Sequence, residues 1–206
     1  IINEDLCLEV VALLKLLRDL FNNDTTTNLL SLCCFNLARL PSKVVAGKLI
    51  PLFRQNRTHW NKQLIQLGYH YMRKPLSMEK FYLEAIIVSK YMSAKSYDTQ
   101  FFKEIVGLYK ILLKIKPSPV VKLNLAYCLH KCNHSQKSMD IMQEVSKELS
   151  DQDFYYILTK AEISRKNRPE EAREMIGSLI ENSMQSTRID HLRGMFEEIG
   201  NRSSPV

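Results

Sequence analysis

The most uneven feature of this 206-residue sequence is a long stretch without acidic residues. Between Thr25 and Met78 there is no Asp and no Glu, whereas eight Lys and Arg residues fall in the same stretch. The whole chain has a formal net charge of +7, so the sequence outside this stretch is almost neutral. Such an asymmetry indicates an acidic partner, which could be an acidic protein surface or a nucleic acid.

Glycine, proline and long apolar runs are also scarce. The six Gly and seven Pro disfavour a β-sandwich or barrel, and the abundance of Leu, Lys, Glu and Met favours helices. No run of about 18 apolar residues occurs, so no membrane association is expected. The first five residues include neither an initiator Met nor a basic n-region, which is typical of a fragment of a longer protein and not of a signal peptide.

The five cysteines form no disulfide framework. An odd number without regular spacing indicates a reducing compartment, so we expect an intracellular protein, cytoplasmic or nuclear. Cys128, Cys132 and His134 resemble a metal cluster, because residues four apart share a helix face. No second pair of ligands has suitable spacing, and free cysteine is often buried. We therefore predict packing cysteines, with no metal and no other cofactor.

Sequence motifs for catalysis are missing. The chain has no Gly-x-Ser-x-Gly, no P-loop, no Gly-x-Gly-x-x-Gly and no His-Glu-x-x-His, and its five histidines are scattered. The sequence therefore predicts a protein that is not an enzyme.

Helical periodicity runs through most of the chain. Short groups of Pro, Asn, Asp and Ser interrupt it, which predicts about eleven helices and no sheet. Short links make successive helices antiparallel neighbours. In the first segment one apolar face is predicted to pack in the core; it includes Leu6, Val10, Leu13, Leu14, Leu17, Leu20 and Phe21. The resulting fold class is all-α.

A period of 34 residues relates two stretches near the C-terminus. Ser138 falls on Ala172, Met142 on Ile176 and Val145 on Leu179. A small residue allows two helices to approach closely, and the later apolar residues fill the gap to the next pair. Repeats of this length are typical of helix pairs.

This spacing resembles the tetratricopeptide repeat, with residues 119–152 and 153–186 as two units. The stretch from Leu64 to Tyr71, with Leu67 and Gly68, resembles the first-helix signature of that family. Position eight of the repeat, where the family has Gly or Ala, is Ala126 in one unit and Lys160 in the next. The resemblance implies a right-handed superhelix of antiparallel helix pairs, an α-solenoid. It would form one helical-repeat domain over residues 1–206, with an irregular basic part (1–118) and a capping helix and tail (187–206).

Two functions fit these observations. The first is a non-catalytic protein–protein interaction scaffold or adaptor module of a larger protein, because helical repeats expose a long concave surface. Its acidic partner segment would bind a contiguous positive face made of Lys43, Lys48, Arg54, Arg57, Lys62, Arg73 and Lys74. The alternative is a sequence-independent RNA- or DNA-binding solenoid that uses the basic tract 39–74, where Trp60 could stack on bases. Trp60 also continues the apolar stripe of its helix, which places it in the core. The oligomeric state is left open.

Overall fold

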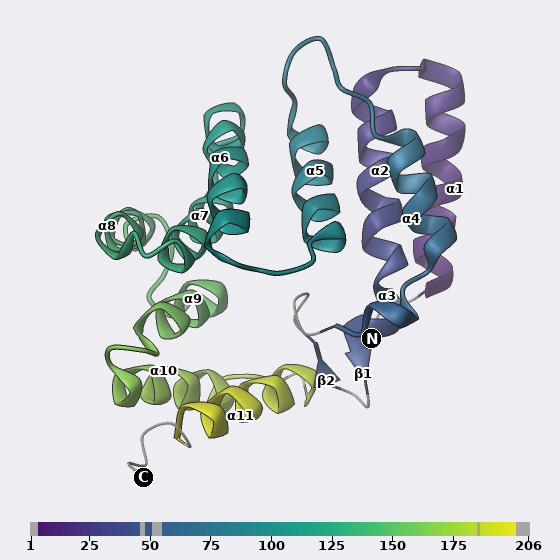
Figure 1. Ribbon diagram of the computed structural model, residues 1–206. Helices are drawn as coiled ribbons and strands as arrows, with labels where there is room; N and C mark the ends of the chain where they lie inside the picture. Colours follow the sequence, from purple (N-terminus) through teal and green to yellow (C-terminus); the bar gives the residue numbers. More distant parts are fainter. Residues whose placement is uncertain (1–3, 46–47, 51–54, 185, 201–206) are drawn as a thin grey trace. The chain divides into compact units, whose positions relative to one another are not determined.

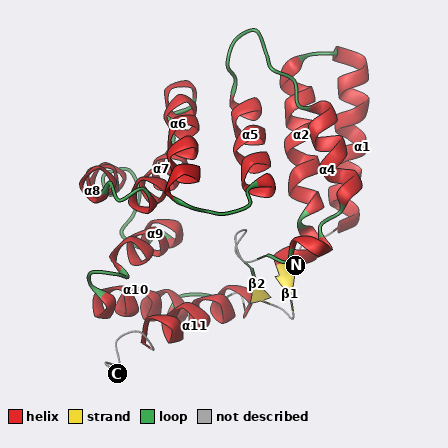
Figure 2. Ribbon diagram, in the orientation of Figure 1, coloured by secondary structure: helices red, strands yellow, loops and turns green. Residues whose placement is uncertain are grey.

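The structure, a computed structural model of the chain, describes residues 4–45, 48–50, 55–184 and 186–200. In these residues eleven α-helices account for most of the secondary structure, as the periodicity predicted (Figures 1 and 2). Two strands of two residues each, β1 (Val44–Val45) and β2 (Lys48–Leu49), pair in one small sheet. The prediction of no sheet missed this hairpin, because two adjacent valines are too short a strand signal beside the helical pattern.

Two compact units make up the chain. Unit 1 comprises Ile1–Val44 and Ile50–Ser96, and unit 2 comprises Val45–Leu49 and Tyr97–Val206. The main boundary therefore falls between Ser96 and Tyr97, inside the part (1–118) that the sequence grouped together as irregular and basic. That the whole chain forms one repeat domain stays a prediction.

Unit 1 is arranged around a central helix. Its helices are α1 (Glu4–Phe21), α2 (Asp24–Ala38), α3 (Leu40–Lys43), α4 (Lys62–Tyr71) and α5 (Lys80–Ser93), with a short 3-10 turn, η2 (Arg57–His59), before α4. Helix α2 packs against α1, α4 and α5 (Figure 1). Asn23 and Asn61 cap α2 and α4, since each side chain accepts a hydrogen bond from a backbone N–H of the first turn. Trp60 is 5% exposed and lies in the core, as expected.

Helices α2 and α4 approach closely where Gly68 faces Phe35. The Ser31 hydroxyl donates a 2.6 Å hydrogen bond to the Gly68 carbonyl across the same contact. Buried Asn28 fixes the segment after α4: its side chain bonds both backbone groups of Arg73 and the Glu79 carboxylate, at 2.8–2.9 Å. The stretch that resembles the first helix of a repeat thus packs on a helix that precedes it.

Helix α1 contradicts its predicted burial. Val11 and Leu14 pack in the core with α2, whereas Leu6, Val10, Leu13, Leu20 and Phe21 are exposed. The prediction was wrong because it assumed packing along the whole apolar face. Among the described helices, α1 has its main contact with α2 alone, which covers only one side.

Unit 2 contains six consecutive helices. They are α6 (Thr99–Ile115), α7 (Pro119–Lys131), α8 (Ser135–Val145), α9 (Phe154–Ser164), α10 (Pro169–Glu181) and α11 (Ser186–Gly200). Helix α7 packs against α6, against its partner α8, and against α9, the first helix of the next pair. Helices α8 and α10 begin at Ser135 and Pro169, 34 residues apart, so the two predicted repeats coincide with two helix pairs.

The matched positions of the two pairs have matched burial. Ser138 and Ala172 are both 0% exposed, and the Ser138 hydroxyl donates a 2.7 Å bond to the Ala126 carbonyl. Met142, Ile176, Val145 and Leu179 are buried as well. The register of 34 residues is therefore confirmed at these core positions.

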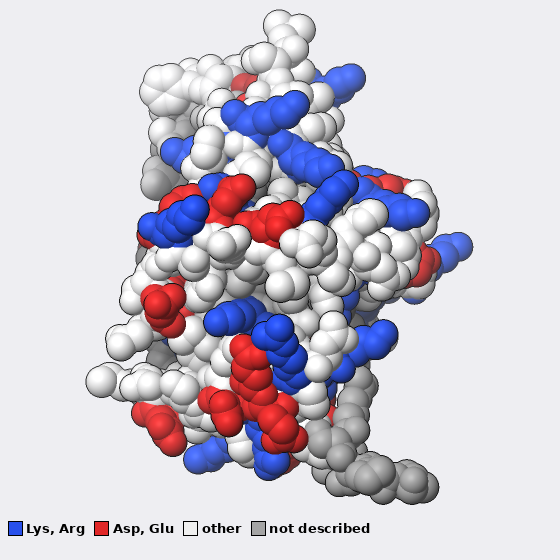
Figure 3. Space-filling view, turned by 90° about the vertical axis from the view of Figure 1, so that its left-hand side faces the viewer, with Lys and Arg blue, Asp and Glu red and all other residues white. Residues whose placement is uncertain are grey.

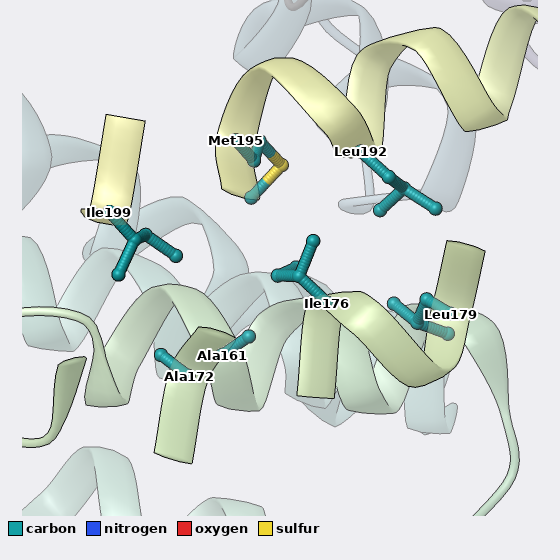
Figure 4. Packing of buried hydrophobic residues seen from close by; sticks show 7 residues of the cluster. All are labelled: Ala161, Ala172, Ile176, Leu179, Leu192, Met195 and Ile199. Atoms are coloured by element: carbon teal, nitrogen blue, oxygen red, sulfur yellow. The ribbon is translucent and has the colours of Figure 1, made fainter. Parts of the chain in front are cut away.

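The second pair continues into α11 through one apolar cluster. Ala161 of α9 lies beside Ala172 of α10, and Ile176 points toward Met195 and Leu192 of α11 (Figure 4). Small residues at the first contact allow α9 and α10 to approach closely, and larger side chains fill the space to α11. In the described part of the chain, every helix is too short or too polar to cross a membrane.

Candidate partner-binding groove

A groove opens in unit 2 between the two helix pairs. It has a volume of about 340 Å³ and lies between the α7–α8 pair and the α9–α10 pair. Its walls comprise the end of α7, one face of α8, one face of α9 and the start of α10. The residues that line it are His130, Ser135, Met139, Met142, Gln143, Ser146, Tyr156, Lys160, Ile163, Ser164, Asn167, Arg168 and Glu171.

The groove has an apolar base and a polar rim. Met142 and Tyr156 are each 7% exposed and belong to the core between α7, α8 and α9. Met139, one turn earlier on α8, is 52% exposed and can contact a ligand directly. Methionine is flexible and polarizable, so it adapts to different apolar side chains. The groove therefore has room for a few side chains of a bound peptide, which is the lower end of the usual range for small-ligand sites.

His130 carries a buried polar atom that lacks a partner. Its Nδ1 atom is inaccessible to solvent and makes no hydrogen bond within the described structure. Burial lowers the pKa of His130 below its ordinary value of 6.5, and the nearby charges of Lys131 and Lys166 lower it further against the opposite effect of Glu162. The imidazole is therefore neutral near pH 7. A buried polar atom without a partner costs free energy, which a ligand that bonds to it would recover.

Positive charge dominates the rim. Lys160 is exposed on α9, and Arg168 at the start of α10 has a side chain 67% exposed. The carboxylate among the lining residues, Glu171, lies 3.2 Å from Arg168 and is thus partly neutralised. Nearby Glu162 is held in the same way by Arg165. Elsewhere on unit 2, acidic and basic side chains are interspersed, as Figure 3 shows on the side where α8 lies.

The bases predicted to bind a partner lie apart from this groove. Lys43 is the last residue of α3 and is half-buried. Lys48 belongs to β2. Arg54, like the side chain of Lys48, lies outside the described residues. Lys62, Arg73 and Lys74 are exposed. Lys62 opens the ten-residue helix α4 and the other two follow its end, so they are separated by roughly 15 Å along the helix.

Arg57 is engaged within the fold, and the expectation that it is free for a partner is wrong. Its guanidinium donates hydrogen bonds to the carbonyls of Ala94, at 2.5 Å, and Tyr91, at 3.5 Å. It also lies 5.5 Å from the centre of the Trp60 ring. These carbonyls end α5 and have no partner inside the helix, so a cation is favourable there. The sequence gave no sign of this role, because the acceptors are more than thirty residues away.

The cysteines behave as predicted for packing residues. Cys128 and Cys132 are 1% and 5% exposed, and the Cys132 thiol faces the Thr99 carbonyl at 3.9 Å. His134 is exposed at the start of α8.

Comparisons with known proteins give similarity without an activity. Residues 1–76 match DUF6596, described as a family of unknown function. The chain is also similar to an uncharacterized protein of Rhizobium meliloti (strain 1021), with 23% identity over 210 residues. This alignment covers 100% of the chain and 50% of the relative, so the chain spans about half the length of the curated relative it matches. No solved structure matches the chain.

Sequence reasoning did not predict the groove. One signal was present: Lys160 occupies the repeat position where Gly or Ala is expected. In the structure this lysine is exposed at the rim of the groove, in a position where a small residue would otherwise lie.

Proposed function

We propose that the chain is a helical interaction module that binds an acidic segment of another protein in the groove of unit 2. The observation that carries this proposal is the combination of an apolar base, a buried Nδ1 atom of His130 without a partner, and a rim with Lys160 and Arg168. A peptide with a carboxylate beside an apolar side chain complements all three features. The role would be that of a scaffold or adaptor.

The arrangement of the helices supports a repeat architecture for this module. The contact of α7 with both α8 and α9, and the equal starts of α8 and α10, are what stacked helix pairs require. We propose that these two pairs are tetratricopeptide-like units of a right-handed α-solenoid. Grooves between stacked pairs are the usual places for extended ligands in such folds.

The groove replaces the basic tract as the proposed site, for two reasons. Arg57 is bonded to the end of α5, and the exposed bases Lys62 and Lys74 lie at opposite ends of α4. In contrast, Lys160 and Arg168 line one groove together. Convergent polar groups around an apolar surface are the usual mark of a binding site.

A titration with synthetic peptides tests the proposal. The probe is a fluorescent peptide rich in Asp, Glu and Leu, and its control has Asn and Gln in place of the acids. We expect the acidic peptide to bind more tightly and more weakly at high salt, because exposed charges are screened within about 8 Å at physiological ionic strength. Lys160→Glu should lower the affinity by about tenfold, which corresponds to about 1.4 kcal/mol.

Lys137→Glu is the matched control. Lys137 is exposed on α8, one helix from Lys160, but it does not line the groove. It changes the net charge of unit 2 equally, so a loss of binding in Lys160→Glu alone supports a local contact. Equal losses in both variants would reduce the effect to long-range charge. Preferential binding of generic RNA, unaffected by Lys160→Glu, would replace the proposal with the nucleic-acid alternative.

A further inference from the structure

Helix α1 exposes more large apolar side chains than a surface helix normally does. Among the described residues of this one helix, seven are at least 43% exposed: Leu6, Leu8, Val10, Leu13, Leu16, Leu20 and Phe21. Its opposite side, with Val11 and Leu14, already packs against α2. Single exposed apolar residues are common, but a contiguous patch indicates an interaction site.

The exposed side chains form a regular stripe. Leu6, Val10, Leu13 and Leu20 follow the spacing of four, three and seven residues, which keeps them on one face of the helix. This is the pattern by which one helix packs along another. The stripe therefore suits a helical partner better than a compact ligand, and it runs nearly the whole length of α1.

Charge on this helix separates by side. Asp5 and Glu9 are exposed, and Glu9 falls between Leu6 and Leu13 on the apolar face. The two bases of α1 are only half-buried or less accessible: Arg18 pairs with Asp19 and lies 5.0 Å from the Tyr71 ring, and Lys15 is close enough to Cys34 to lower the pKa of its thiol. Both bases are thus directed toward the packed side, and the exposed charges are acidic.

We propose that the exposed face of α1 binds an amphipathic helix of another protein, with a leucine-rich stripe flanked by Lys or Arg. Apolar contacts along the stripe would supply affinity, and bases on the partner would pair with Asp5 and Glu9 and fix its register. A second copy of this chain fits less well. In a symmetric dimer the same surface meets itself, and this surface offers acids without exposed bases to match them.

This surface is distinct from the groove of unit 2 in position and in charge. The groove has a positive rim and suits an acidic segment, whereas α1 suits a basic one. The module would therefore hold two partner segments of opposite charge. Substitutions in the groove should leave binding at α1 unchanged, which separates the two proposals experimentally.

Anisotropy titrations of the full chain with two synthetic helical peptides test the inference. Both peptides carry the same leucine stripe, and the flanking residues are Lys in one and Glu in the other. We expect the Lys peptide to bind more tightly. Leu13→Ser should weaken its binding by about tenfold or more, because it removes the burial of one leucine side chain. Glu9→Lys should reverse the preference between the two peptides.

Val120→Ser is the matched control, since Val120 is an exposed apolar residue of unit 2, 57% exposed. It should leave the affinity unchanged, and circular dichroism should show that each variant stays folded. Equal affinity for the two peptides, or binding unchanged by Leu13→Ser, would overturn the inference. So would a concentration-dependent dimer that Leu13→Ser abolishes, because the occupant of the face would then be a second copy.

Discussion

Replacing Gly68 by alanine should destabilise unit 1, although alanine is the better helix former. A Cβ atom on Gly68 would lie 2.6, 2.7 and 2.9 Å from three carbon atoms of the Phe35 ring. Phe35 is 0% exposed, and its ring also meets Tyr69 edge-on at 5.0 Å between ring centres. The ring therefore has little freedom to move away, and α2 and α4 must separate.

A matched substitution isolates the cost of this clash. In a helix interior, Gly→Ala alone stabilises by about 1 kcal/mol. Overpacking a tight core contact costs about 1–3 kcal/mol. Gly107 lies in helix α6, and a Cβ there would meet no atom within 4 Å. Since both variants gain the same helix propensity, Gly68→Ala should fall below Gly107→Ala by about 1–3 kcal/mol in free energy of unfolding.

Urea unfolding followed by far-ultraviolet circular dichroism measures both variants. The single Trp of the chain, Trp60, lies in the same cluster as Phe35, so its fluorescence reports unfolding of unit 1 specifically. Adding Phe35→Leu to Gly68→Ala should recover part of the loss, because a smaller side chain relieves the contact. If Gly68→Ala proves as stable as Gly107→Ala, the close approach of α2 and α4 described here is incorrect.

Three further predictions concern other parts of the chain. Ala172→Leu should cost about 1–3 kcal/mol, because this 0% exposed position has no room for a larger side chain; an unchanged thermal midpoint would disprove the 34-residue register. His130 has a pKa below that of the unfolded chain, so the unfolded state takes up more protons below about pH 6.5, and stability should fall as the pH is lowered through this range. Urea unfolding at two pH values should show a smaller fall for His130→Gln, and an equal fall would assign the effect to other groups. Burial raises the pKa of the Cys34 thiol to about 11, so Cys34 should react with iodoacetamide much more slowly than the more exposed Cys33, as peptide mass mapping can show.

The helical content and the C-terminal register could be predicted from the sequence because they depend on local patterns. Ser118, Asp153 and Pro169 mark helix starts by their own chemistry, and Ser138 and Ala172 are small where two helices must touch. These signals need no knowledge of distant residues. The eleven helices and the matched core positions followed from them.

The roles of individual charges and apolar faces could not be predicted in the same way. Arg57 is an exposed base in the sequence, but distant carbonyls of α5 bind it in the fold. Leu13 has the spacing of a core residue, and only the contacts of α1 show that its side is left uncovered. The groove has the same origin, because His130, Lys160 and Arg168 meet only when two helix pairs stack.

Methionine methyl spectra of the full chain, labelled with ¹³C, test the central claim most directly. Met139 and Met142 line the groove, whereas Met72 and Met78 flank Arg73 and Lys74 of the basic tract. On addition of the acidic, leucine-containing peptide, we predict that the Met139 and Met142 signals shift and that those of Met72 and Met78 stay in place. Shifts confined to Met72 and Met78 would contradict the account and place the acidic partner on the basic tract of unit 1.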